Sequence, residues 1–78
     1  MAKDRKMICF WTAVEFLKTR EEFTMEELED EVIRRGGIFR IAPNYPLRDF
    51  INEYVADGWL KFDYSSGKYI NLRLKKNK

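Results

Sequence analysis

The sequence contains no histidine, and its one cysteine, Cys9, has no second thiol with which to form an internal disulfide. A structural zinc site needs about four Cys or His ligands, so we expect no metal in this chain. A thiol without a disulfide framework is typical of a reducing compartment, and we therefore expect a cytoplasmic protein in which Cys9 is a core residue.

The groups that most catalytic sites need are also scarce. The chain has no Cys–His pair, no glycine-rich phosphate loop and no strand-bounded serine nucleophile. Acidic residues are numerous, but their spacing is typical of a solvated helix face. We therefore expect neither an enzyme nor a cofactor.

Long apolar stretches are missing as well. No stretch approaches the ~20 apolar residues that a membrane span requires, so no membrane partner is expected. A basic start followed by the apolar residues 7–11 is superficially similar to a signal peptide. The run soon reaches Glu15 and Lys18 without a small-residue cleavage site, which argues against that interpretation.

Aromatic residues are what the chain has in quantity. Six Phe, four Tyr and two Trp occur in 78 residues, a length that predicts a single domain. A domain of this size buries little surface for its length, and each aromatic side chain can add roughly 150–250 Å². We therefore expect an aromatic core.

The charges are unevenly distributed, although the net charge is only +2. Residues 15–33 contain eight acids and two bases, whereas residues 59–78 contain six bases and one acid. Such polarity predicts an acidic side and a basic side, and the basic side is a possible surface for phosphates.

A first helix is predicted over residues 4–19, with Asp4 as its cap. The apolar residues spread over so much of its surface that they indicate either deep burial or a contact with a partner, and we expect a homodimer through Ile8, Trp11 and Phe16. The expected buried face consists of Met7, Phe10, Trp11, Val14 and Leu17.

A second helix is predicted over residues 25–35. Thr24 and Glu27 have the spacing of a capping box, and Gly36 and Gly37 can end the helix. Phe23 is expected to form a very short strand that pairs with a later hairpin. The inward residues are expected to be Met25, Leu28, Val32 and Ile33.

A third helix is predicted over residues 45–57, after a partly apolar connection over residues 38–44. Gly58 ends it, and alternating residues then predict a hairpin over residues 59–74, with a turn at 65–67 and a basic tail at 75–78. Leu47, Phe50, Ile51, Tyr54 and Val55 are expected to face inward on the helix, and Leu60, Phe62, Tyr64, Ile70, Leu72 and Leu74 on the hairpin.

These elements predict an α+β fold: a three-helix bundle followed by a C-terminal two-stranded β-hairpin. The string VADGWLKF at residues 55–62, which ends a helix and opens a strand, resembles the pattern of winged-helix DNA-binding domains. The resemblance covers residues 7–74 and extends to small archaeal, phage and viral transcriptional regulators, which are usually homodimers. It implies that the third helix enters the major groove of double-stranded DNA and that the hairpin, the wing, lies on phosphates.

The candidate DNA-binding residues follow from this placement. Arg and Asn side chains can make paired hydrogen bonds to guanine and adenine, so Arg48 and Asn52 are expected to read bases. Tyr45 is expected to contact a phosphate or to stack. The cations expected to neutralise phosphates are Lys61, Lys68 and Arg73 on the hairpin and Arg40, with Arg34 and Arg35, beside the turn between the second and third helices.

Other interpretations of the same residues stay open. Asp49, Glu53 and Asp57 form an acidic stripe on the third helix, and carboxylates repel phosphates. This stripe predicts a protein–protein interaction module as the alternative function. Basic residues on a hairpin also protect a sheet edge from aggregation, and RNA is a further possible ligand.

Overall fold

The computed structural model describes residues 4–76 and the side chains of residues 4–74. Within this range it contains four helices and two small antiparallel sheets, which confirms the α+β class. The elements in chain order are α1 (Arg5–Thr19), β1 (Glu22–Thr24), α2 (Met25–Arg34), β2 (Arg40–Ala42), β3 (Tyr45–Pro46), α3 (Leu47–Ala56), β4 (Leu60–Asp63), β5 (Lys68–Asn71) and α4 (Leu72–Lys76).

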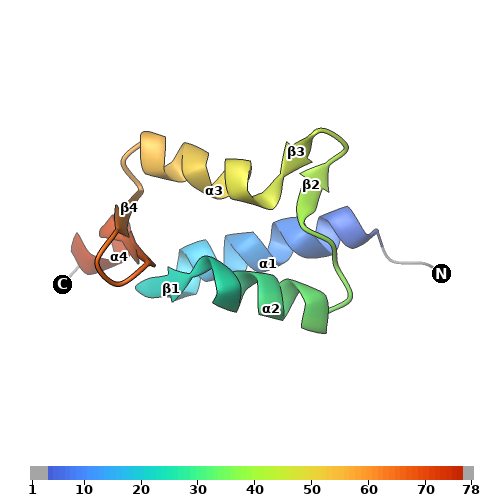
Figure 1. Cartoon of the computed structure of the whole chain (residues 1–78), viewed down its shortest axis with the longest axis horizontal. Coiled ribbons are helices and arrows are strands. Elements are labelled where there is room, and N and C mark those ends of the chain that lie inside the picture. Colours follow the sequence, from blue (N-terminus) through green and yellow to red (C-terminus); the bar gives the residue numbers. More distant parts are fainter. Residues whose placement is uncertain (1–3, 77–78) are drawn as a thin grey trace.

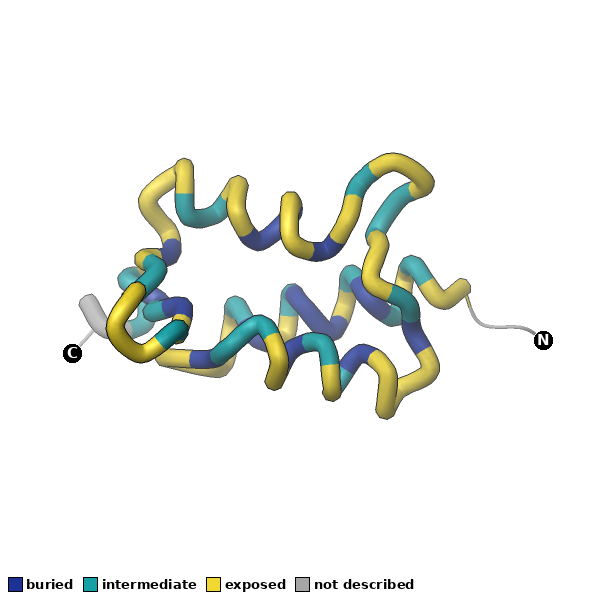
Figure 2. Tube along the Cα trace, viewed as in Figure 1, coloured by how far each residue is buried: buried dark blue, intermediate teal, exposed yellow. Residues whose placement is uncertain are grey.

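The three longer helices form the body of the molecule. In Figure 1, α2 and α3 lie along opposite sides with α1 behind them, the hairpin and α4 lie at one end, and β2–β3 lies near the other. The buried positions of the helices lie where the helices face one another (Figure 2). No helix in the described part of the chain has both the length and the apolarity needed to cross a membrane.

Helix α1 begins where the sequence predicts, because the Asp4 carboxylate accepts a hydrogen bond from the Lys6 amide at 2.9 Å. The predicted buried face is only partly confirmed. Phe10 and Leu17 pack against the core, but Met7 and Trp11 are 47% and 57% exposed. Both sides of α1 are apolar, and the side with the smaller residues allows α2 and β2 to approach. The buried residues are Cys9, Thr12, Ala13 and Phe16.

Phe16 cannot belong to the predicted dimer contact, because it is only 1% exposed. Its ring packs edge-to-face against Phe23 at 5.5 Å between centroids, and the Arg20 guanidinium lies 4.2 Å above it. Of the three residues proposed for that contact, only Ile8 and Trp11 reach the surface of α1.

The predictions for β1 and α2 are largely confirmed. The Glu27 amide donates to the Thr24 hydroxyl at 3.0 Å, and the Thr24 amide donates to the Glu27 carboxylate at 2.9 Å. Phe23 lies in a three-residue strand that pairs with β5. Gly36, with φ 90°, follows the helix in the left-handed conformation. Ile33 differs from the prediction, since it is 56% exposed.

The connection between α2 and α3 contains a structure that the sequence did not predict. Residues on either side of Pro43 pair as β2 and β3, so Tyr45 belongs to a strand and α3 begins only at Leu47. Pro46 has extended backbone angles and precedes the helix, and the Leu47 amide donates to the Phe39 carbonyl at 3.0 Å. Gly37 lies tightly against Ile8 and Val32, where an added Cβ would approach their methyl groups to 2.9 Å.

The hairpin is shorter than predicted, because the chain turns into α4 after Asn71. Strand β5 is central in the order β1-β5-β4. The predicted alternation of β5 is reversed, since Tyr69 and Asn71 are buried and Ile70 is only partly buried. Strand β1 explains the reversal: Tyr69 lies opposite both Phe23 and Phe62, and the three rings form one aromatic row.

The turn and the C-terminal end of the hairpin also differ from the predictions. Tyr64 was expected to face inward but is 89% exposed in the turn. Leu72 and Leu74 lie in α4 and not in a strand. Residues 75 and 76 of the predicted basic tail complete α4, and residues 77–78 lie outside the described residues.

Candidate nucleic-acid interface

Helix α3 presents its polar side to solvent, as predicted. Leu47, Phe50 and Ile51 are buried, and this holds the opposite arc of the helix outward. The exposed arc carries Arg48, Asp49, Asn52, Glu53 and Ala56.

Arg48 extends from α3 towards α2 and towards the hairpin. Its Nε lies 3.7 Å from a carboxylate oxygen of Glu29, and its side chain remains 69% exposed. The pKa of Tyr69 is raised mainly by burial, and the positive charge of Arg48 opposes this shift while Tyr64 adds to it. Arg48 is therefore close enough to Tyr69 to lower the pKa of its hydroxyl against the effect of burial.

The other side of the exposed arc is acidic. A shallow depression is lined by Tyr45, Asp49, Asn52, Glu53 and Ala56. The hydrogen bond between the Tyr45 hydroxyl and Glu53, with the nearby Asp49 carboxylate, raises the pKa of Tyr45 to about 12. The Tyr45 ring also packs edge-to-face on Phe50 at 6.1 Å. Tyr45 is thus held among carboxylates, where a phosphate would be repelled.

Lys61 and Lys68 lie on the outward face of the sheet, opposite Ile70 and Asp63. Both are exposed. The Lys68 ammonium lies 3.6 Å from a Glu22 carboxylate oxygen on β1. This face is therefore mixed in charge.

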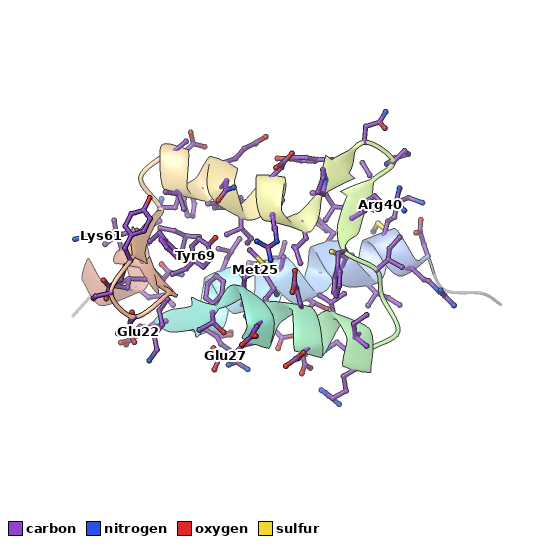
Figure 3. All side chains as sticks on the ribbon, viewed as in Figure 1. Glu22, Met25, Glu27, Arg40, Lys61 and Tyr69 are labelled. Atoms are coloured by element: carbon purple, nitrogen blue, oxygen red, sulfur yellow. The ribbon has the colours of Figure 1, made fainter. Side chains whose placement is uncertain are left out.

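Arg73 and Arg40 are not on the hairpin surface. Arg73 lies on α4, because the strand ends at Asn71, and its guanidinium stacks 4.0 Å from the centre of the Trp59 ring. Arg40 lies on β2 and donates to the Pro43 carbonyl at 3.4 Å. Figure 3 shows Arg40 and Lys61 at opposite ends of the molecule, so the predicted cations do not form one patch.

Arg35 joins α2 to α1, whereas Arg34 pairs within α2. Arg35 donates to Glu15 on α1 at 3.0 and 3.1 Å and to Glu31 at 2.7 Å, and Arg34 also pairs with Glu31. These guanidinium groups lower the pKa of Glu31 to about 2. Both arginines are therefore already neutralised by acids of their own bundle.

The turn of the hairpin is organised by Asp63. Its carboxylate accepts hydrogen bonds from the Ser65 amide at 3.2 Å and from the hydroxyls of Ser65 and Ser66 at 2.8 and 2.9 Å, and these bonds lower the pKa of Asp63. The Gly67 amide donates to the Asp63 carbonyl at 2.7 Å. Sequence reasoning missed Tyr64 at this tip, although its position directly before Ser-Ser-Gly was a signal for a turn.

Potential metal ligands and the one thiol are placed as follows in the described residues. No group of three His, Cys, Asp or Glu side chains within them could hold a metal ion. Cys9 is buried, and burial raises the pKa of its thiol to about 11, which disfavours the reactive thiolate.

Comparisons with protein-family models, with curated proteins and with solved structures found no match for this chain.

Proposed function

We propose that this chain is a winged-helix domain that binds double-stranded DNA, with α3 in the major groove and the hairpin on the phosphates, and that it acts as a small transcriptional regulator. The order of its elements supports the proposal. The hairpin β4–β5 follows α3 directly, and β1, which immediately precedes α2, completes the sheet in the order β1-β5-β4. The role in regulation rests on the resemblance alone.

The observation that carries the proposal is the position of Arg48. It projects from α3, lies 3.7 Å from a carboxylate oxygen of Glu29 on α2 and acts electrostatically on Tyr69 of β5. Because α3 also contacts β4, its polar side lies next to the hairpin. In such an arrangement the cation on the helix can contact base edges, and the exposed hairpin can contact the phosphate backbone of DNA.

The ion pairs of this surface do not prevent phosphate binding. Arg48 lies 3.7 Å from Glu29 and Lys68 lies 3.6 Å from Glu22, and the two cationic side chains are 69% and 48% exposed. Exposed pairs of this kind are worth about 0–1 kcal/mol. A phosphate can therefore replace either carboxylate at little cost.

Replacing both outward lysines, Lys61→Ala with Lys68→Ala, is expected to weaken duplex binding and to flatten its salt dependence. Each lost phosphate contact lowers the slope of log K against log salt by about 0.9, so the double variant should lose about 1.8. The measurement is the affinity for random-sequence duplex DNA, by fluorescence anisotropy, over a series of salt concentrations.

The matched control removes two cations from α1, Arg5→Ala with Lys18→Ala. It changes the net charge equally, but α1 lies behind α2 and α3 in Figure 1. This variant should keep the wild-type slope. An equal loss in both double variants would show a nonspecific charge effect and would contradict the assignment to the hairpin.

A second function is favoured by the acidic depression beside Tyr45. Asp49 and Glu53 converge there, and a basic peptide would suit them better than DNA does. In this alternative the domain is a protein–protein interaction module. The same salt titration decides between the two, because the module predicts no salt-sensitive binding of the wild-type chain to duplex DNA.

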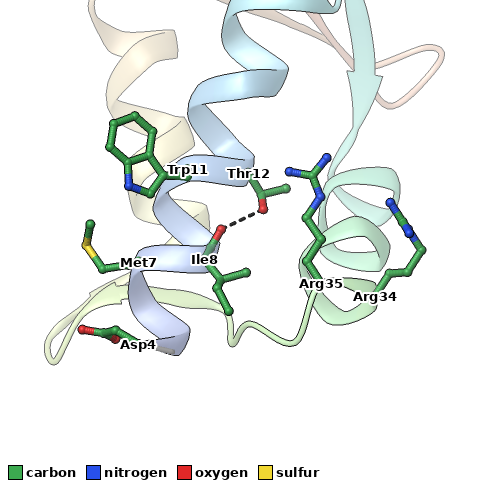
Figure 4. Close-up of a pocket in the computed structure, with 7 residues that line it drawn as sticks. All are labelled: Asp4, Met7, Ile8, Trp11, Thr12, Arg34 and Arg35. Carbon is green, nitrogen blue, oxygen red and sulfur yellow. Dashed lines mark hydrogen bonds between the residues drawn. The ribbon is translucent and has the colours of Figure 1, made fainter. Parts of the chain in front are cut away.

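We also propose that the protein acts as a homodimer through α1. A groove between α1 and α2 has Asp4, Met7 and Trp11 on one side, Ile8 and Thr12 between, and Arg34 and Arg35 on the other (Figure 4). Trp11 and Met7 are large, apolar and exposed, and a buried Trp is a common anchor of interfaces.

The substitution Trp11→Glu is expected to convert a dimer into a monomer, because it would place a charge in an apolar contact. Light scattering should give twice the mass of one chain for the wild type and a single mass for the variant. Tyr64→Glu, an equally drastic change at an exposed aromatic on the hairpin, should remain dimeric. A wild-type chain of single mass at working concentration would contradict the proposal.

A further inference from the structure

Tyr64 is the most exposed large apolar residue in the described part of the chain, at 89%. It makes an edge-to-face contact with Phe62, with 4.9 Å between ring centroids and planes at 84°. This contact supports the ring from the strand below and leaves most of its surface open to solvent. Tyr64 therefore contributes little to the core but has a defined orientation.

The backbone that carries Tyr64 is held in place on both sides. Asp63 accepts three hydrogen bonds from Ser65 and Ser66, and Gly67, with φ 73°, closes the turn by donating to the Asp63 carbonyl. A ring on such a turn loses little conformational entropy when it binds.

Cations lie on the elements next to this ring. Lys61 and Lys68 extend from the two strands that the turn joins, on the outward face of the sheet, and Arg48 on α3 acts electrostatically on Tyr69, as Tyr64 does. An exposed ring with cations on neighbouring elements has the composition of sites that bind single-stranded nucleic acid, in which bases stack on aromatic faces and cations hold the backbone.

We propose that Tyr64 stacks on an unpaired nucleobase next to the duplex, so that the protein prefers a junction of double- and single-stranded DNA over a blunt duplex. The hairpin lies at the end of the molecule, beyond the C-terminal end of α3 (Figure 1). A duplex on α3 can therefore end or open beside Tyr64. This inference rests on the DNA binding proposed above.

The test compares a blunt DNA duplex with the same duplex carrying a short thymidine overhang, at either the 3′ or the 5′ end. Stacking is expected to favour one overhang about tenfold over the blunt duplex, which corresponds to ~1.4 kcal/mol. Tyr64→Leu should abolish this preference and leave the affinity for the blunt duplex unchanged. Tyr64→Phe keeps the ring and should keep the preference.

Any other result counts against the stacking role of Tyr64. Equal affinity for blunt and overhanging duplexes, or a preference that survives in Tyr64→Leu, overturns the stacking role and leaves DNA binding intact. A Tyr64→Leu variant that binds both probes more weakly by the same factor shows that Tyr64 contacts the duplex, which also overturns it. A wild-type chain without salt-dependent DNA binding overturns this inference together with the proposed function.

Discussion

Replacing Phe23 by alanine is expected to remove a large share of the stability of the fold. Phe23 is 1% exposed, stacks on Tyr69 at 5.5 Å and meets Phe16 edge-to-face at 5.5 Å. Losing a buried Phe side chain costs about 3–5 kcal/mol, because apolar burial is lost and a cavity remains. A domain of this length has a total stability of about 4–12 kcal/mol.

The measurement is thermal unfolding followed by circular dichroism. For a domain of 60–100 residues, 1 kcal/mol shifts the midpoint by about 4–8 °C, so Phe23→Ala should lower it by at least ~12 °C or leave the chain unfolded. Tyr64→Ala removes an exposed aromatic from the same hairpin sheet and should change the stability by no more than about 0.5 kcal/mol. Similar midpoints for the two variants would show that Phe23 is not part of the core.

The position of Phe23 shows which parts of the fold the sequence could predict. Its strand lies directly before a capping box, and the box is a local signal because Thr24 and Glu27 bond to each other's backbone amides. Asp4 at the start of α1 and Gly58, with φ 83°, after α3 are equally local. Such signals need no knowledge of the remaining chain, and the helix boundaries they predict differ little from those observed.

The orientation of the elements was less predictable. Helix α1 is apolar on several sides, so spacing alone could not show that Ala13 and Phe16 face inward while Trp11 stays exposed. In β5 the alternation of apolar residues favoured Ile70, but pairing with β1 placed Tyr69 inside. In both elements tertiary contacts decided between two faces of comparable apolarity.

The exposure of some candidate residues was predictable, but the surface that they form was not. Exposure of Arg48 and Asn52 follows from the helical period of α3. The pairing of Arg48 with Glu29 joins α3 to α2, and the stacking of Arg73 on Trp59 depends on α4. Neither contact could be derived from spacing, because each joins segments that the fold alone brings together.

The burial of Asn71 differs from what the sequence predicts. An Asn near the end of an alternating strand was expected to face solvent, yet it is 2% exposed. Its Nδ2 donates to the Leu17 carbonyl at 2.6 Å, and its Oδ1 accepts from the Leu74 amide at 3.1 Å. One side chain thus joins the last turn of α1 to the first turn of α4.

The substitution Asn71→Leu is expected to destabilise the protein by about 2–4 kcal/mol, although it makes the strand more apolar. Leucine keeps a similar size but leaves two partly buried backbone groups without their partners, and each such group costs about 1–3 kcal/mol. Chemical denaturation measures the loss, and hydrogen exchange should show that the Leu74 amide loses protection. Asn52→Leu, at an exposed site on α3, should change the stability by no more than about 0.5 kcal/mol. Equal stability of Asn71→Leu and the wild type would mean that burial of leucine compensates for both lost hydrogen bonds, and the ties from Asn71 to α1 and α4 would then have no net effect on the free energy of unfolding.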